Sequence, residues 1–148
     1  MVFTAAAIAL LKQLEGLRLD AYLDGAGVPT IGYGTTGPGI ALGVTWTQEQ
    51  ADAALATSVG AFARGVPALV HVSLSDAQFS ALVIFAYNVG LQALAGSTAL
   101  RRVNGGLFSM VPEALGSWCH IHDPHTGALV VSPGLQHRRQ AEIDLWNS

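Results

Sequence analysis

The sequence predicts an α+β fold in which a small antiparallel sheet near the N-terminus is followed mainly by helices. Apolar residues recur at helical spacing over residues 5–18, glycine-punctuated extended segments fill residues 20–46, and capped helical patterns occupy most of the rest. A chain of 148 residues has the size of one compact domain. We therefore expect residues 1–148 to form a single domain, with a sheet lobe at about 20–46 and a helical lobe from the remainder.

The first helix is expected over residues 5–18, where Ile8, Leu11, Leu14 and Leu17 form one apolar stripe. Residues 20–33 then favour a hairpin or small sheet, because short extended pieces alternate with glycine and proline. A turn-rich loop follows at residues 34–39.

Two further helices are predicted from their capping patterns. Thr47 and Gln50 form one such pair, and Ser75 and Gln78 form another; in each, a hydroxyl and an amide side chain satisfy free backbone groups at a helix start. The first pair opens a long helix at 48–64, and the second opens an apolar core helix that stops near Gly90. Additional helices are expected at 97–104, 109–118 and 134–146, whereas residues 120–133 are expected to lack regular structure.

The composition argues against several classes of protein. It is 51% hydrophobic, yet charged and polar residues interrupt every apolar run before the roughly 20 residues that a membrane helix needs. We therefore expect no stable membrane insertion. The formal net charge of -3 gives no general attraction for nucleic acid. Residues 1–16 lack the basic leading region and cleavage site of a secretory signal peptide, so we interpret them as part of the first helix.

The cysteine and histidine content predicts neither a disulfide nor a metal site. Cys119 is the only cysteine, which excludes an internal disulfide and fits a reducing compartment during synthesis. Histidines cluster around Asp123, but their spacing fits no zinc pattern; they are His120, His122 and His125. We expect no metal and no cofactor.

Glu15 is a candidate general acid. It stands where the apolar stripe of the first helix would continue, at i+4 from Leu11 and i+7 from Ile8. Partial desolvation there favours the protonated carboxyl group, which can donate a proton to a glycosidic oxygen. Its position alone also permits the alternative that Glu15 faces solvent at the helix end or pairs with an arginine.

Asp24 and Thr30 are candidates for the other half of such a site. Glycoside cleavage needs a carboxylic acid beside the leaving oxygen and a second carboxylate across the bond. Asp24 supplies a carboxylate at the tip of the first extended segment, although Asp-Gly is also a common turn pair. The Thr30 hydroxyl either holds a water against Asp24 or belongs to a residue that simply favours strands.

The segment EGLRLDAYLDGAGVPTIGYGTT, residues 15–36, resembles the signature of the phage-type lysozymes, glycoside hydrolase family 24. The matching positions are Glu15-Gly16, Tyr22, Asp24, Gly27 and Thr30-Ile31-Gly32-Tyr33-Gly34. Residues 81–90, 97–106 and 134–146 also resemble later segments of that family.

This resemblance implies a lysozyme-like fold, with a cleft between the two lobes and the long helix joining them. It implies hydrolysis of the β-1,4 bond between N-acetylmuramic acid and N-acetylglucosamine in peptidoglycan, with inversion at the anomeric carbon. By resemblance, Glu15 is the acid, Asp24 is the base that positions a water, and Thr30 helps to place that water.

Two features depart from the family pattern. Thr35 follows the Gly-Tyr-Gly run where many members have histidine, but that histidine is not one of the three catalytic residues. The chain is also mildly acidic, with an isoelectric point of about 5.9, whereas several relatives are basic. Its wall binding and salt response are therefore expected to differ.

Three further residues are candidates for supporting roles. Arg138, in the segment that resembles the family's C-terminal helix, is the predicted partner that orients Glu15; the alternatives are that Arg138 is a surface residue, or that Arg18, one turn beyond Glu15, is the partner. Tyr33 is expected to line the cleft. Asn88 is expected either to reach the substrate or to cap its helix.

Two other functions remain open from the sequence: a catalytically silent wall-binding module, and a bacterial toxin or effector with the same chemistry. The intact set of Glu15, Asp24 and Thr30 argues against the first. The endolysin interpretation predicts a monomer that acts on peptidoglycan for host lysis. It predicts accumulation in the host cytoplasm until a holin-type lesion releases the enzyme to the wall.

Overall fold

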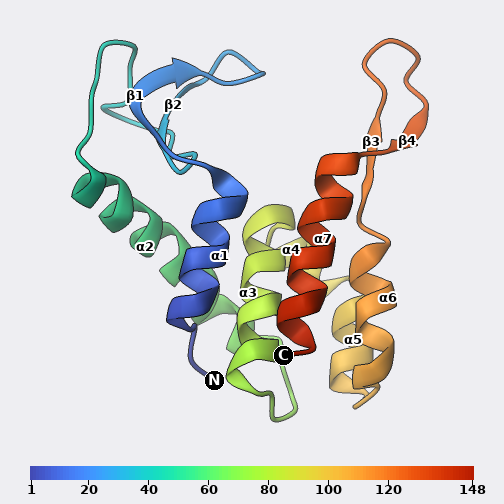
Figure 1. Cartoon of the computed structure of the whole chain (residues 1–148). Coiled ribbons are helices and arrows are strands. Elements are labelled where there is room, and N and C mark those ends of the chain that lie inside the picture. The colour runs from blue at the N-terminus through green and yellow to red at the C-terminus, as the bar shows by residue number, and fades with distance from the viewer. The chain divides into compact units, whose positions relative to one another are not determined.

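The computed structural model describes residues 1–148 and confirms the α+β class, with helices predominating over two small antiparallel sheets. The chain divides into two compact units: unit 1 comprises residues 1–7 and 62–148, and unit 2 comprises residues 8–61. Helix α1 (Ala5–Glu15) begins in unit 1 and ends in unit 2, and α2 (Gln48–Gly65) runs from unit 2 back into unit 1 (Figure 1).

The sheet of unit 2 is a hairpin of β1 (Arg18–Leu23) and β2 (Pro29–Gly32). The strands are antiparallel, with Tyr22 opposite Thr30 and Leu23 opposite Pro29, and an irregularity interrupts the pairing between residues 18 and 22. Residues 44–46 run along β1, since the Ala21 amide donates to the Val44 carbonyl at 2.9 Å and the Trp46 amide donates to the Leu19 carbonyl at 2.8 Å. The hairpin or small sheet predicted at residues 20–33 is therefore confirmed, with its strand pairing starting slightly earlier, at Arg18.

Gly32 at the end of β2 makes room for an aromatic ring. Its φ is 67°, and a Cβ there would lie 3.1 Å from the Trp46 ring and 3.4 Å from the Ala51 side chain. Glycine alone combines this left-handed backbone with so close an approach. The strand can therefore turn while packing against the loop and α2.

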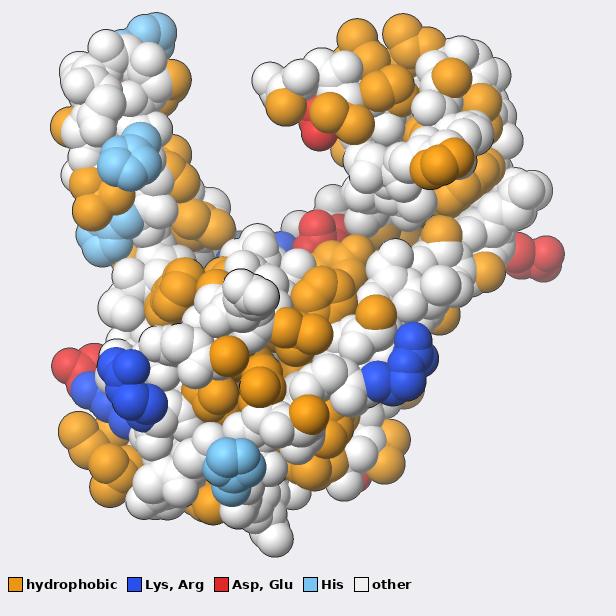
Figure 2. Space-filling model, turned by 180° about the vertical axis from the view of Figure 1, so that it is seen from behind, with side chains coloured by type: hydrophobic (Ala, Val, Ile, Leu, Met, Phe, Trp, Pro, Cys, Tyr) orange, Lys and Arg blue, Asp and Glu red, His pale blue; other side chains and the backbone are white.

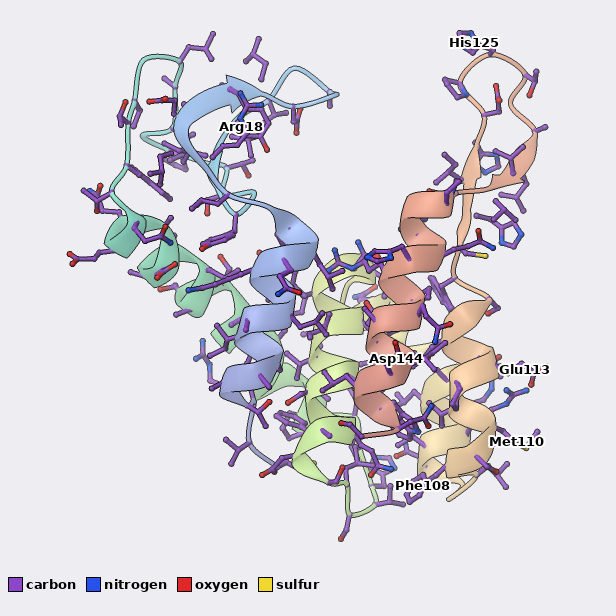
Figure 3. All side chains as sticks on the ribbon, viewed as in Figure 1. Arg18, Phe108, Met110, Glu113, His125 and Asp144 are labelled. Carbon is purple, nitrogen blue, oxygen red and sulfur yellow. The ribbon has the colours of Figure 1, made fainter.

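Unit 1 is built around α3 (Asp76–Val89), in which every residue from Phe79 to Ala86 is buried. Helix α7 (Pro133–Trp146) packs against α3 and α6 (Val111–Gly116), and α5 (Thr98–Asn104) packs against α6. The remaining helical elements are the short α4 (Leu91–Ala95) and the 3-10 turns η1 (Val66–Ala68) and η2 (Phe108–Met110). Figure 3 shows Asp144 on α7, with Glu113 and Met110 near α6.

Both predicted capping pairs are confirmed. The Gln78 amide donates to Ser75 Oγ at 3.1 Å while the Ser75 amide donates to Gln78 Oε1 at 3.0 Å, and α3 starts there. The Gln50 amide donates to Thr47 Oγ1 at 3.2 Å and the Thr47 amide donates to Gln50 Oε1 at 2.8 Å, at the start of α2. Local hydrogen bonding alone thus places two helix starts.

The first helix is shorter than predicted. It ends at Glu15, because Gly16 adopts a φ of 70° and its amide closes the last turn on the Lys12 carbonyl at 3.0 Å. Leu17, which the stripe included, lies outside the helix, and both Ile8 and Leu17 are 38% exposed whereas Leu11 is fully buried. A left-handed glycine at this position is a common helix terminator.

The prediction that residues 120–133 lack regular structure is wrong. Strands β3 (His120–His122) and β4 (Leu129–Val131) form an antiparallel hairpin in unit 1, with Ile121 opposite Val130. The hairpin extends beyond the adjacent helices with His125 at its tip (Figure 3), and histidine side chains lie along its surface (Figure 2). Asp123 Oδ1 stabilises the turn by accepting hydrogen bonds from the amides of His125 and Thr126, at 2.8 and 2.9 Å.

None of the helices combines the length and the apolar character needed to cross a membrane.

Candidate active site

Glu15 is the last residue of α1 and its side chain is partly buried. The left-handed Gly16 ends the helix directly after it, and β1 begins at Arg18. A short linker therefore connects the carboxylate-bearing end of the helix to the strand that leads to Asp24. Glu15, Asp24 and Thr30 all belong to unit 2.

Asp24 directly follows β1 and organises the turn to β2. Its Oδ1 accepts hydrogen bonds from the amides of Ala26 at 2.9 Å and Val28 at 2.8 Å. Its backbone also closes the turn, because the Asp24 amide donates to the Val28 carbonyl at 3.0 Å and the Gly27 amide donates to the Asp24 carbonyl at 2.9 Å. Asp24 is therefore a turn residue, as the alternative from the sequence proposed. The two amide hydrogen bonds, both accepted by Oδ1, fix the orientation of its carboxylate.

Thr30 is buried in β2, and its hydroxyl is tied to the same turn. Its Oγ1 donates to the Val28 carbonyl at 2.9 Å, while the Val28 amide donates to Asp24. Val28 therefore connects the two polar side chains through its peptide groups. Because the hydroxyl proton is used in this bond, the hydrogen-bonding capacity left on Thr30 Oγ1 is that of an acceptor.

Tyr33 is buried, and its hydroxyl takes part in a polar cluster. It donates to Asp52 Oδ1 at 3.2 Å and accepts from Gln48 Nε2 at 3.0 Å. Lys12 Nζ lies 2.9 Å from the same Asp52 oxygen. Lys12, Gln48 and Asp52 were not predicted as site residues; the one signal in the sequence is the i, i+4 spacing of Gln48 and Asp52 on the predicted helix.

The Lys12–Asp52 ion pair shifts the titration of both partners. The Lys12 ammonium and the Gln48 amide lower the pKa of Asp52, chiefly through their hydrogen bonds, and partial desolvation opposes this. The hydrogen bond to Asp52 raises the pKa of Lys12. Both groups are therefore charged at neutral pH.

Arg18 does not extend the first helix, so the expectation that it lies one turn beyond Glu15 is wrong. It opens β1 (Figure 3), and its guanidinium carbon lies 4.0 Å from the centroid of the Tyr22 ring. This distance is typical of a cation stacked on an aromatic face.

Arg138 is buried in unit 1, so the alternative that it is a surface arginine is wrong. Its Nε lies 3.4 Å from Glu142 Oε1, one turn further along α7. The neighbouring Arg139 also pairs with Glu142, with 3.0 Å between Nε and Oε2. Arg139 and Glu142 were not predicted as partners, although Glu142 follows the two arginines at the i, i+3 and i, i+4 spacing typical of helical ion pairs. The pairing of Arg138 with Glu15 stays a prediction.

Asn88 lies within α3, which ends at Val89 and is capped by Gly90, so Asn88 is not its cap. Its Oδ1 accepts a hydrogen bond from Arg139 Nη2 at 2.6 Å. A cavity of about 430 Å³ opens beside it; the lining residues are Asn88, Val89, Ser117, Trp118, His120 and Leu135. No group of three or more His, Cys, Asp or Glu side chains is arranged to hold a metal ion.

Comparison with known proteins identifies the family. The family model described as phage lysozyme matches residues 12–142, which include Glu15, Asp24, Thr30 and Arg138. The chain is 37% identical over 153 residues to an endolysin of Bacillus phage PZA, covering 100% of this chain and 56% of the relative. It is 41% identical over 139 residues to a SAR-endolysin of Pseudomonas phage phiKMV, covering 94% of this chain and 84% of the relative. The chain thus spans little more than half the length of the Bacillus phage relative.

Solved structures give the same result. An endolysin from Escherichia coli O157:H7 phage FAHEc1 superposes with a TM-score of 0.92 at 36% sequence identity, covering 99% of this chain and 93% of that one. The lysozyme-like fold predicted from the sequence is therefore confirmed. On the family match and the full-length similarity to endolysins, the chain belongs to the phage lysozyme family.

Proposed function

We propose that this chain is an endolysin that hydrolyses the β-1,4 bond between N-acetylmuramic acid and N-acetylglucosamine in peptidoglycan, for host lysis. The observation that carries the proposal is the turn that holds Asp24 and Thr30 through Val28, placed shortly after a helix that ends in Glu15, inside the region that matches the phage lysozyme family. A glycosidase needs these components: one carboxyl group as acid, and a second that controls a nucleophile.

In the proposed reaction, Glu15 donates a proton to the glycosidic oxygen of the leaving sugar. Asp24 accepts a proton from the attacking water, so that the water oxygen bonds to the anomeric carbon as the bond to the leaving oxygen breaks. The transition state has oxocarbenium character, and the product has inverted configuration when water attacks from the face opposite the leaving group.

The hydrogen bonds around Val28 explain how that water is held. Asp24 Oδ1 is occupied by the amides of Ala26 and Val28, so Oδ2 is the oxygen we assign to the water. Thr30 Oγ1 gives its proton to the Val28 carbonyl and is therefore an acceptor toward the water. A water that donates one hydrogen to Asp24 and the other to Thr30 has its lone pair directed away from both, toward the sugar.

Arg138 and Asn88 complete the proposal in unit 1. Arg138 is assigned to orient Glu15, and its burial on α7 supports a fixed position for the guanidinium group. Asn88 is assigned to substrate binding, because it lies on the wall of the cavity that also includes Trp118 and His120. We propose that residues 1–148 act together as one monomeric catalytic domain.

The site of action follows from the family. Endolysins act on the cell wall of the host, and this enzyme is proposed to remain in the host cytoplasm until a holin-type lesion admits it to the wall. Relatives named SAR-endolysin point to a second route of release without a holin. Lysis by this protein expressed in cells, with and without a co-expressed holin, distinguishes the two routes.

A turbidity assay on outer-membrane-permeabilised Gram-negative cells tests the assigned roles. Glu15→Gln and Asp24→Asn are each expected to slow clearing by about 10²- to 10⁴-fold, the usual contribution of a positioned acid or base. Glu49→Gln and Asp144→Asn make the same chemical changes at exposed positions and are expected to clear as the wild type does. Equal clearing by all five proteins would overturn the catalytic assignment.

Product analysis tests the stereochemical part. Wild-type digestion of peptidoglycan in H₂¹⁸O should place the label at the new reducing end, and the first anomer detected should be the inverted one. A wild-type protein that sediments with walls without releasing reducing ends would instead identify a silent wall-binding module.

A further inference from the structure

A polar cluster in unit 2 gathers three side chains around one oxygen of a fourth. Asp52 Oδ1 receives Lys12 Nζ at 2.9 Å, Gln48 Nε2 at 2.8 Å and the Tyr33 hydroxyl at 3.2 Å. Gln48 Nε2 also donates to the Tyr33 hydroxyl at 3.0 Å, and Lys12 Nζ lies 5.7 Å from the centroid of the Tyr33 ring. We call these residues, Lys12, Tyr33, Gln48 and Asp52, the Asp52 cluster.

The Asp52 cluster connects the elements that carry the proposed catalytic residues. Lys12 lies three residues before Glu15 on α1, and Tyr33 lies three residues after Thr30 in the turn that follows β2. Gln48 and Asp52 lie one turn apart at the start of α2. The Tyr33 hydroxyl and the Lys12 ammonium group thus both contact Asp52 on α2. This helix carries neither the proposed acid nor the proposed water-binding residues.

Tyr33 sits in a turn that transmits its position to Thr30. The backbones of Ile31 and Thr35 exchange two hydrogen bonds, at 2.9 and 2.8 Å, so residues 31–35 form a closed loop. Ile31 and Tyr33 are buried, and Gly32 packs closely against Trp46. A shift of the Tyr33 ring therefore moves a tight loop whose first residue adjoins Thr30.

We propose that the Asp52 cluster is a positioning network, which holds the Glu15 end of α1 at a fixed spacing from the strand that carries Thr30. The inference rests on the proposed hydrolase function and adds residues that act without touching the reacting atoms. Small displacements matter in such a site, because a misplacement of about 1 Å can lower a rate by about 10²-fold.

The charges of the cluster fit this role. The Lys12 and Asp52 side chains are 31% and 39% exposed, so the ion pair by itself adds little to stability. Three donors on a single carboxylate oxygen restrict its orientation more than a lone surface pair would. Removal of the Asp52 carboxylate is therefore expected to alter geometry and rate more than folding.

The test measures kcat and KM on soluble, uncrosslinked peptidoglycan strands. Asp52→Ala and Tyr33→Phe are each expected to lower kcat by about 10- to 100-fold with KM changed less than about threefold. Asp52→Asn keeps an acceptor oxygen for Gln48 and Tyr33 and should recover at least part of the loss. Glu113→Ala, which removes the exposed pair with Arg102 in unit 1, is the matched control and should keep the wild-type kcat.

A double variant provides the sharpest criterion. If the cluster acts as one unit, Tyr33→Phe combined with Asp52→Ala should lose no more kcat than the worse single variant, because the network is already broken. A purely structural role would lower the melting temperature and leave the kcat of the folded fraction intact, and that result overturns the proposal. Tyr33→Phe retains the buried ring, so a folded variant is available even where a larger truncation unfolds the chain.

Different experimental outcomes would contradict the hydrolase proposal and the positioning network. An inactive wild type, or an active Glu15→Gln variant, would remove the hydrolase proposal itself. An active wild type, an inactive Glu15→Gln variant and a fully active Asp52→Ala variant would remove only the positioning network.

Discussion

Arg139 and Glu142 form an ion pair inside unit 1, with 3.0 Å between Nε and Oε2 and with only 1% and 0% of their side chains exposed. The guanidinium carbon also lies 4.9 Å from the centroid of the Phe85 ring on α3, and Nη2 donates to Asn88. Burial lowers the pKa of Arg139, and the charge of Glu142 opposes that shift. Helices α3 and α7 are therefore joined by a polar contact within their apolar interface.

Removal of Glu142 should destabilise the protein strongly. Glu142→Ala would remove the carboxylate that pairs with the buried Arg139, and breaking a buried pair in this way typically costs about 3–5 kcal/mol. Asp144→Ala, two residues away at an exposed position of α7, should change the free energy of unfolding by less than about 0.5 kcal/mol. Urea unfolding measures both, and a Glu142→Ala variant as stable as Asp144→Ala would contradict the prediction.

The Thr30 hydroxyl should matter for rate more than for folding. Thr30→Val preserves the shape of the side chain but removes the bond to the Val28 carbonyl and the acceptor assigned to the water. We expect kcat to fall by about 10²-fold, while Thr30→Ser retains the hydroxyl and most of the activity. The comparison of kcat with melting temperature decides the point: a Thr30→Val variant of normal kcat and lowered stability would leave Thr30 as a strand residue only.

The Lys12–Asp52 pair predicts a pH-dependent contribution to stability. Because the folded-state pKa of Asp52 lies below its ordinary value of 3.8, its contribution is complete above that value and disappears as the pH falls through the lower folded value. The pKa of Lys12 lies above 10.5, so its contribution is complete below that value and is lost as the pH rises through the higher folded one.

Thermal unfolding across pH tests this window. Asp52→Asn should melt slightly below the wild type near neutral pH, and the difference in Tm should shrink as the pH falls below 3.8 and through the lower folded pKa of Asp52. Asp144→Asn provides a carboxylate control that lacks a lysine partner. A difference in Tm that stays constant from acid to neutral pH would show that charge is not the source.

Gly32 should not tolerate a side chain. Gly32→Ala forces a Cβ into a left-handed backbone and to 3.1 Å from the Trp46 ring, and the backbone alone is expected to cost about 1–2 kcal/mol. Gly25→Ala, in the turn between β1 and β2, meets no atom within 4 Å and has no positive φ, so it should be neutral or slightly stabilising. Equal melting temperatures for the two variants would contradict the packing described for Trp46.

The sequence predicted those features whose cause is local. Two helix starts could be predicted because side chains there form hydrogen bonds with the backbone three residues away. The pairs are Ser75 with Gln78 and Thr47 with Gln50. The hairpin at residues 120–131 was missed because each strand has only three residues, too few for an alternating pattern to stand out among His, Pro and Gly. Gly16 ends the first helix through its left-handed backbone, which the apolar stripe over residues 5–18 does not reveal.

In the candidate site, too, residues close in sequence could be predicted, and residues joined by the tertiary fold could not. Glu15, Asp24 and Thr30 lie within 16 residues and match a family signature, so sequence alone brought them together. Lys12, Gln48 and Asp52 did not emerge, because their contact depends on the tertiary arrangement of α1, the β2 turn and α2. Asp123 also shows that geometry alone is insufficient: its Oδ1 accepts two amide hydrogen bonds much as Asp24 does, yet it stabilises the turn of a hairpin remote in sequence from Glu15.

The five-residue turn from Asp24 to Val28 has an evolutionary implication. The carboxylate accepts its hydrogen bonds from amides only two and four positions downstream, so its orientation is set mainly by the turn itself. Such a loop can be inherited, or transplanted between scaffolds, as an intact module. We therefore expect distant homologues to vary freely in surface charge and helix composition while retaining the length of this loop, since one inserted or deleted residue would point the carboxylate elsewhere.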